Sequence, residues 1–377
     1  HFGPWGMRQL ATTARSSLTC LCVGLLSNRL LHMVAADEPS CTVGALKKSN
    51  VTLLEAAGVT LESISPLGAS VRGLDLRTKP SEEVLGALQA EMATRGYLVF
   101  KGQGVLSGEE QVAASEYWGG RRIHSTHGVH PKAPNKHIFR LSNDRAHGIL
   151  GVGPQWHNDG SFERGVFSHV GYHIVRVPEN GGGTVFAHQG AAFDALPPAD
   201  QERWQRLVSV NSNSGVLHPV VHSHPISKRK SVYLHLGMTG AVLECFPDRE
   251  DPGERVRLLE EAEMRALFNA YNDLLNAGFA DRTRAPYTDV YHYEEGDLVV
   301  IDNLAVAHRA APEAHESAEK QGLRILHRTT VRAMENFDPP FGLPPALDIH
   351  GRNPTGQGVW QGGGIGFRWD EQIRMQN

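Results

Sequence analysis

Three side chains in this 377-residue chain have the types and spacing of metal ligands. His157 and Asp159 are two residues apart, so on an extended strand they project from the same face. His308, far along the chain, supplies a second imidazole. Two histidines and one carboxylate can cap one face of an octahedral ion and leave three adjacent positions open, as expected for non-haem Fe(II) oxygenases. We therefore take these three residues as candidate ligands of Fe(II).

The neighbours of these residues matter, because the chain has 20 histidines and a single buried histidine is usually a satisfied core residue. The aliphatic run 298–301 predicts a buried strand just ahead of His308. A second predicted strand, 322–331, carries Arg324 and Arg328 on one face. A guanidinium fork suits a carboxylate. Together with the hydroxyl of Thr184, two such arginines would hold a dicarboxylate against the metal.

These features resemble the taurine dioxygenase family of Fe(II)/2-oxoglutarate-dependent dioxygenases. The resemblance runs from about residue 60 to residue 335, with its motifs in the family's order. The matching segments are Trp156-His157-Asn158-Asp159, Gly182-Gly183-Thr184, Asp302-Asn303 with His308, the segment 324–328, Ile64-Ser65-Pro66-Leu67-Gly68, Gly73-Leu74-Asp75-Leu76 and Gly96-Tyr97-Leu98-Val99-Phe100.

The resemblance implies a role for each candidate residue. It implies that His157, Asp159 and His308 bind iron, and that Thr184 and Arg324 bind the distal carboxylate of 2-oxoglutarate. Arg328 would face an anionic group of the substrate, and His124 would contact the substrate. The implied reaction consumes 2-oxoglutarate and O2, releases succinate and CO2, and oxidises a small anionic or polar substrate, with hydroxylation as the default outcome.

Departures from the family pattern argue against taurine itself as the substrate. His127 stands where the taurine enzyme has an aromatic residue, and Gly153 stands where it has an asparagine. The stretch from His308 to Arg324 is also longer than the family pattern. Its charged residues, 313–321, predict a surface loop near the pocket mouth.

Several alternatives stay open at this point. His218, His222 and His224 form either a metal cluster or a polar loop over the pocket, and they lack the cysteines and helical spacing of structural zinc sites. Arg324 and Arg328 could be structural ion-pair partners, and Thr184 a turn residue. A non-catalytic jelly-roll protein that binds a metal or a carboxylate is a rival function. A serine hydrolase is another rival, but the chain has no Gly-x-Ser-x-Gly motif.

Composition narrows the classes of partner. The net charge is −4, from 37 basic and 41 acidic residues, so no excess of positive charge favours nucleic acid or a membrane surface. A small-molecule substrate is the expected partner, and a homo-oligomer stays open. Four cysteines, three of them before residue 45, argue against a disulfide framework and favour a reducing intracellular compartment.

The two ends of the chain differ in composition from its middle. Residues 1–45 read as a leader, since no acidic residue occurs from Met7 to Ala36. A secretory signal ending near Ala35, an organelle transit peptide and a disordered leader are all consistent with it. Residues 341–377 form a tail rich in Gly and Pro. The catalytic domain is expected between them, at 60–340.

The predicted fold is mainly β with α: a double-stranded β-helix, or jelly roll, braced by helices. Ser81 is the expected N-cap of a helix that ends before Gly96, and Ser107 begins a capping box toward a second helix. The longest helix is expected at 254–277, with an apolar stripe that faces the core. Strands are expected at 137–141, 171–177, 208–211, 231–236, 287–293, 298–301 and 322–331.

Overall fold

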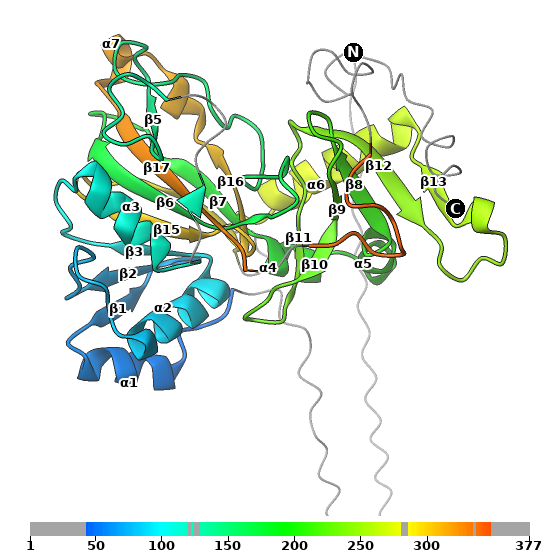
Figure 1. The fold of residues 1–377 in the computed structure, drawn as a ribbon, viewed down its shortest axis with the longest axis horizontal. Helices are drawn as coiled ribbons and strands as arrows, with labels where there is room; N and C mark the ends of the chain where they lie inside the picture. The colour runs from blue at the N-terminus through cyan, green and yellow to red at the C-terminus, as the bar shows by residue number, and fades with distance from the viewer. Residues whose placement is uncertain (1–42, 120–121, 124–128, 280–285, 335–336, 348–377) are drawn as a thin grey trace, which may run out of the picture. The chain divides into compact units, whose positions relative to one another are not determined.

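The computed structural model describes residues 43–119, 122–123, 129–279, 286–334 and 337–347 (Figure 1). These residues belong to one compact unit, Pro39–Asn377. His124, His127 and all but the last residues of the predicted leader lie outside the described residues, as does most of the predicted tail.

The largest sheet has eight strands, with the order β1-β2-β3-β15-β6-β17-β4 and β5 paired to β17. Its central strands are almost wholly buried, which agrees with their aliphatic and β-branched sequences. The strands are β1 (Thr60–Ser63), β2 (Ala69–Arg72), β3 (Tyr97–Phe100), β4 (Arg122–Ile123), β5 (Phe139–Ser142), β6 (Phe167–Arg176), β15 (Leu298–Asp302) and β17 (Ile325–Arg332). The predicted strands at 298–301 and 322–331 are confirmed, although Arg324 lies one residue before β17.

A second sheet of three strands packs against this one. It consists of β7 (Thr184–His188), flanked by β14 (Thr288–Tyr291) and β16 (Val306–Ala310). Phe186 and Val306 from this sheet share a core with Tyr172 and Ile301 from the large sheet. The two facing sheets form the predicted jelly-roll core, and they are not joined into a closed barrel.

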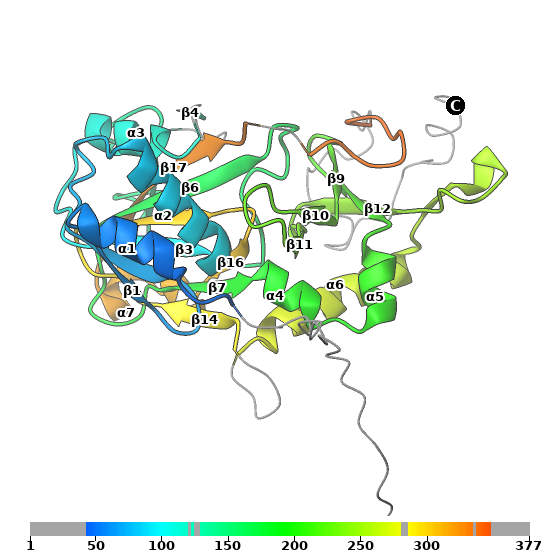
Figure 2. The same cartoon turned by 90° about the horizontal axis from the view of Figure 1, so that it is seen from below.

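Helices cover the outer face of the large sheet (Figures 1 and 2). They are α1 (Lys48–Ala56), α2 (Glu82–Arg95) and α3 (Gly108–Glu116). The Ser81 side chain accepts a hydrogen bond from the Val84 N–H, and Gly96 ends α2 with φ of 92°, a conformation that favours glycine. Ser107 and Glu110 form the predicted capping box of α3. Both predicted helix starts are therefore confirmed.

The segment between β7 and β14 adds a smaller α/β region, which shares one core with β7 and β16 and has a second core around its four-stranded sheet. It contains a four-stranded sheet and a hairpin of β10 and β11. Its elements are α4 (Gln189–Asp194), α5 (Pro198–Trp204), β8 (Leu207–Asn211), β9 (Leu217–Pro219), β10 (Val221–Ser223), β11 (Lys230–Val232), β12 (Thr239–Cys245), η1 (Pro252–Glu254), β13 (Val256–Leu258) and α6 (Glu261–Asn276).

Two expectations about helices and loops were wrong in detail. The longest helix starts at Glu261 and not at residue 254, because Val256–Leu258 pairs with β12 as a strand. Its apolar stripe is buried as predicted. The expected loop at 313–321 is instead the turn η2 (Pro312–His315) followed by the short helix α7 (Ala318–Gln321). Within the described residues, the helices are too short or too polar to cross a membrane.

Candidate active site

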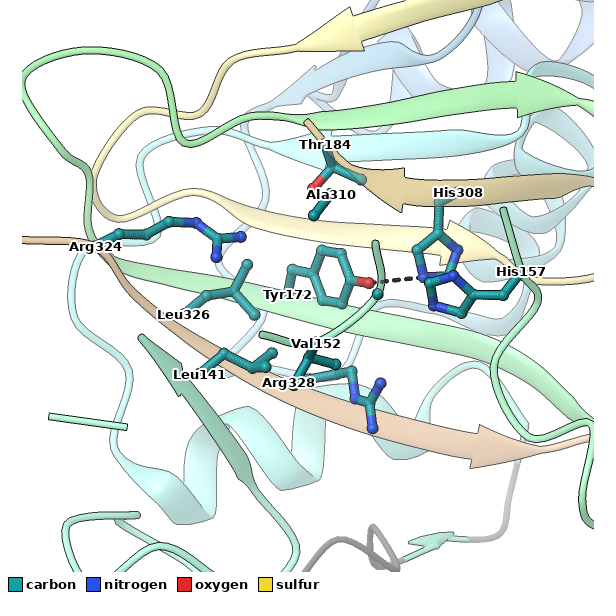
Figure 3. Close-up of a pocket in the computed structure, with 11 residues that line it drawn as sticks. Leu141, Val152, His157, Tyr172, Thr184, His308, Ala310, Arg324, Leu326 and Arg328 are labelled. Atoms are coloured by element: carbon teal, nitrogen blue, oxygen red, sulfur yellow. Dashed lines mark hydrogen bonds between the residues drawn. The ribbon is translucent and has the colours of Figure 1, made fainter. Parts of the chain in front are cut away.

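Backbone pairing brings the two candidate histidine ligands together. The His157 N–H donates to the His308 carbonyl at 3.1 Å, and the His308 N–H donates to the His157 carbonyl at 2.9 Å. His308 lies in β16, so a short segment of the chain extends the small sheet and places both side chains side by side. Their ring centroids are 4.2 Å apart. Figure 3 shows the two rings adjacent at one end of the pocket.

Asp159 completes this group. Its Oδ1 lies 3.8 Å from His157 Nε2, and its Oδ2 lies 4.0 Å from His308 Nε2. All three residues are buried, and their ligand atoms lie within 4.8 Å of one another. Among the residues that the structure describes, this is the single group of three or more His, Cys, Asp or Glu residues so arranged.

Two asparagines hold the segment that carries Asp159. The Asn303 Oδ1 accepts from the Asp159 N–H at 2.8 Å, and the Asn303 Nδ2 donates to the Asp159 carbonyl at 2.9 Å. Asn158 donates to the Val306 carbonyl at 3.1 Å and to Gln189 Oε1 at 2.9 Å. Both asparagines are fully buried. Their hydrogen bonds connect the Asp159 segment to the end of β15 and the start of β16, and so fix the position of the carboxylate.

The electrostatics favour neutral imidazoles beside an ionised carboxylate. Burial, with the nearby His157, lowers the pKa of His308 to about 3, and burial also lowers the pKa of His157. Burial acts to raise the pKa of Asp159, but Arg328 and the two histidines outweigh it and lower that pKa to about 2. This is the protonation state that metal coordination requires.

The donor set fits a divalent metal. His157 Nδ1 lies 2.8 Å from the Gln155 carbonyl, so this nitrogen carries the hydrogen and leaves the Nε2 lone pair for a metal. His308 Nδ1 and Asp159 Oδ2 are buried without a hydrogen-bond partner within the described residues. Neighbouring ligand atoms on a metal with bonds of ~2.1 Å lie about 3 Å apart, so the two histidine–carboxylate separations of 3.8 and 4.0 Å need to close by about 1 Å.

A pocket extends from these residues along the inner face of the large sheet (Figure 3). Arg324 lies at the end away from the histidines, and Thr184, at the start of β7, lines the pocket between Arg324 and His308. The Arg324 Nε donates to the Gly182 carbonyl at 3.1 Å, and its guanidinium points into the pocket. Tyr172 from β6 lies between the two ends, with its hydroxyl 3.0 Å from His308 Nε2. The structure thus brings Thr184 and Arg324 into the same pocket as the histidines.

Arg328 lies next to the carboxylate ligand. Its NH1 donates to Asp159 Oδ1 at 2.8 Å, and its guanidinium lies over the Phe139 ring, 4.8 Å from the centroid. Arg324 and Arg328 both line the pocket, as their predicted shared face requires. His124, the other predicted substrate contact, lies outside the described residues.

Gly153 has a steric role at this site. Its φ is +71°, and a Cβ added there would lie 2.9 Å from His157 Cε1. A side chain at this position would press on the ring of a candidate ligand. The departure from the family's asparagine therefore leaves room for the His157 ring.

The three histidines between 218 and 224 do not form a metal site. His218 is in β9 and His222 in β10, and both are buried. His224 Nε2 lies 3.0 Å from Asp302 Oδ2, a buried pair. None of them belongs to the metal-ligating group within the described residues. His218 and His222 lie in strands and not in the polar loop over the pocket that was the alternative.

Sequence reasoning missed Tyr172 and His235. Tyr172 could have been found, because its alternation with Val170 and Ile174 along β6 places all three toward the inner core. His235 has its ring centroid 5.1 Å from that of His157. The Leu236 N–H donates to the Trp156 carbonyl at 3.1 Å, a pairing between distant segments that no local pattern indicates.

Comparisons with known proteins agree with this architecture. The family model for taurine catabolism dioxygenase TauD, TfdA family, matches residues 60–330. An alpha-ketoglutarate-dependent sulfonate dioxygenase of Saccharomyces cerevisiae is 26% identical over 304 residues, covering 74% of this chain and 69% of its own. Pentalenolactone F synthase of Streptomyces arenae is 27% identical over 320 residues, covering 74% and 95%.

The fold is also similar to solved structures. A putative alpha-ketoglutarate-dependent taurine dioxygenase from Burkholderia xenovorans superposes with a TM-score of 0.60 at 20% identity, covering 77% of this chain and 95% of that one. The predicted jelly-roll fold is thereby confirmed. With the family match over most of its length, the chain belongs to the TauD, TfdA family, and it is an oxidoreductase of the 2-oxoglutarate-dependent dioxygenase class.

Proposed function

We propose that His157, Asp159 and His308 hold one Fe(II), and that the chain uses it to oxidise a small anionic or polar molecule. The observation that carries this proposal is the convergence of three buried ligand atoms within 4.8 Å, at the end of a pocket lined by two arginines. When bound, Fe(II) together with 2-oxoglutarate and O2 supplies the oxidising equivalent, and the 2-oxo acid leaves as succinate and CO2.

Thr184 and Arg324 are proposed to hold the distal carboxylate of 2-oxoglutarate. The pocket suits a dianion, because two guanidinium groups and no acidic side chain are among its lining residues in the described part of the chain. The Gly182 carbonyl fixes Arg324 Nε, which leaves the outer guanidinium nitrogens for a bidentate pair with a carboxylate. The Thr184 hydroxyl adds a neutral donor on the opposite wall.

Arg328 is proposed to bind an anionic group of the substrate. Its guanidinium is held between the Phe139 ring and Asp159 Oδ1, so it is preorganised beside the proposed metal. An anionic group bound by Arg328 would lie next to Asp159, one of the three proposed metal ligands. The yeast relative is named for its action on sulfonates, which are anions of this kind. The predicted contact of His124 with the substrate belongs to the same proposal.

Hydroxylation of a C–H bond is the proposed outcome, and the substrate can be found by a coupled assay. Purified chain with Fe(II), 2-oxoglutarate and O2 would be screened with sulfonates, sulfate esters, phosphonates and carboxylates for succinate above the substrate-free background. We expect at least one anionic compound to raise succinate, and Asp159→Ala to lose both the background and the stimulated rate. Succinate formation that persists in Asp159→Ala would refute the metal assignment.

A further inference from the structure

A second, larger cavity of about 460 Å³ lies away from the metal-ligating residues. Tyr172 faces the pocket beside His308, whereas His169, an odd number of residues earlier in β6, points to the other face of the large sheet. His169 pairs in register with Asp302 of β15. The cavity is therefore on the helix-covered face of the sheet, where Trp118 belongs to the core under α2 and α3.

The walls of this cavity are mainly apolar. Trp118, Leu304 and Phe337 are among its large apolar lining residues, and Ile226, which also lines it, has 42% of its surface accessible. A volume of this size is within the range of small-molecule sites, which are about 300–1,000 Å³. The cavity can thus hold a molecule with a body about as large as one or two aromatic rings.

Trp118 and His169 place two buried polar atoms beside the cavity. Trp118 and His169 are 3% and 5% exposed, and Trp118 Nε1 and His169 Nε2 are buried without a hydrogen-bond partner within the described residues. The indole N–H can only donate, so the partner it lacks is an acceptor. Buried polar atoms are nearly always hydrogen-bonded, which makes two unpaired atoms on one wall unusual.

The charge at the cavity favours an anionic ligand. Lys228 lines it, and no acidic side chain does so among the lining residues that the structure describes. Asp302 lies behind His224, is 2% exposed and is paired with His224 Nε2 at 3.0 Å. The neighbouring His224 Nδ1 accepts from the N–H groups of Ile226 and Ser227, which fixes this wall. The wall is preformed, and Lys228 is the one lysine or arginine among the lining residues that the structure describes.

We propose that this cavity is a second binding site, which takes a small organic anion with an apolar, ring-sized body. The apolar body would lie against Trp118, Leu304 and Phe337, and the anionic end would lie toward Lys228. The site is separated from the proposed iron by the thickness of the large sheet, so it does not depend on the metal or on the proposed oxidation.

The cavity is connected to Asp159 through residues that follow one another in the sequence. The Leu304 N–H donates to Asp302 Oδ1 at 3.0 Å. Asn303, between these two residues, holds both the N–H and the carbonyl of Asp159. A ligand that contacts Leu304 and His224 therefore rests on the same strand end that positions Asp159.

Naphthalene-2-sulfonate is a suitable probe, titrated by calorimetry into the full chain loaded with Mn(II) and saturated with 2-oxoglutarate. 2-Oxoglutarate occupies its own part of the metal pocket, and the same titration of Arg328→Ala reports any probe bound at the substrate position beside Arg328. We expect one probe molecule per chain. Ile226→Trp should weaken binding at least about tenfold by filling the cavity from its exposed side. Lys228→Asn should weaken it about threefold, because asparagine tolerates the φ of 62° at this position while removing the charge.

Lys230→Gln is the matched control, since Lys230 is an exposed lysine of the same hairpin that does not line the cavity. Its affinity for the probe should equal that of the wild type. The proposal is overturned if the probe does not bind below millimolar concentration, or if Mn(II) and 2-oxoglutarate displace it. It is equally overturned if Ile226→Trp binds as tightly as Lys230→Gln.

Discussion

Removal of the Arg324 side chain tests the proposed grip on 2-oxoglutarate. Arg324 is half-buried, is fixed through Nε by the Gly182 carbonyl, and directs its outer nitrogens into the pocket. Truncating one partner of a buried, hydrogen-bonded charge pair costs about 2–5 kcal/mol. Partial exposure places Arg324 near the lower end of that range. Arg324→Ala should therefore weaken 2-oxoglutarate binding about 30- to 150-fold, which corresponds to about 2–3 kcal/mol.

The measurement is calorimetric titration of 2-oxoglutarate into protein loaded with Mn(II). Arg176→Ala is the matched control, because Arg176 is an exposed arginine of the same large sheet, paired with Glu295 at 3.4 Å. Arg324→Lys should lie between the wild type and Arg324→Ala, since it keeps the charge and loses the fork. If Arg324→Ala bound 2-oxoglutarate within about threefold of the wild type, the cosubstrate assignment would be wrong.

Three further predictions concern the substrate, the Asp159 segment and pH. Arg328→Ala should leave 2-oxoglutarate affinity unchanged and uncouple succinate formation from product formation; an unchanged ratio of the two would make Arg328 structural. Asn303→Ala should lower the free energy of unfolding in urea by about 1–3 kcal/mol for each buried group left unpaired, and weaken Mn(II) binding; unchanged values of both would contradict the role of Asn303. Burial lowers the pKa of His218 and of His222 to about 4. At pH 5 each histidine is neutral in the folded protein but protonated in the unfolded chain, whose histidine pKa is about 6.5. Each should therefore lower the free energy of unfolding by about 2 kcal/mol at pH 5 relative to pH 7. Urea unfolding of the metal-free protein at both pH values checks this, and equal stability would contradict it.

Local signals in the sequence were sufficient for much of the fold. The caps at Ser81 and Ser107 are chemical features of single turns, and they marked the starts of α2 and α3 correctly. The strand at 298–301 was evident from its aliphatic run. By contrast, the start of α6 depends on Val256–Leu258 pairing with β12, a tertiary contact that overrides local helix propensity.

The candidate site was also only partly predictable from the sequence. His157, Asp159 and His308 could be chosen from residue type, spacing and motif order, and the structure brings them together. The orientation of each ligand could not be predicted, because it depends on Asn303 and on the backbone bridge between His157 and His308. The contact of His235 with His157 likewise arises only when segments far apart in the sequence pack side by side.

Metal stoichiometry tests the central claim most directly. Anaerobic Fe(II) should bind to the wild type at one ion per chain, measured by metal analysis after dialysis. The variants His157→Ala, Asp159→Ala and His308→Ala should each lose that ion, because two remaining ligands hold it poorly. His235→Ala should keep it, since His235 lies beside the group without belonging to it. Full retention of iron by the three ligand variants would contradict the account.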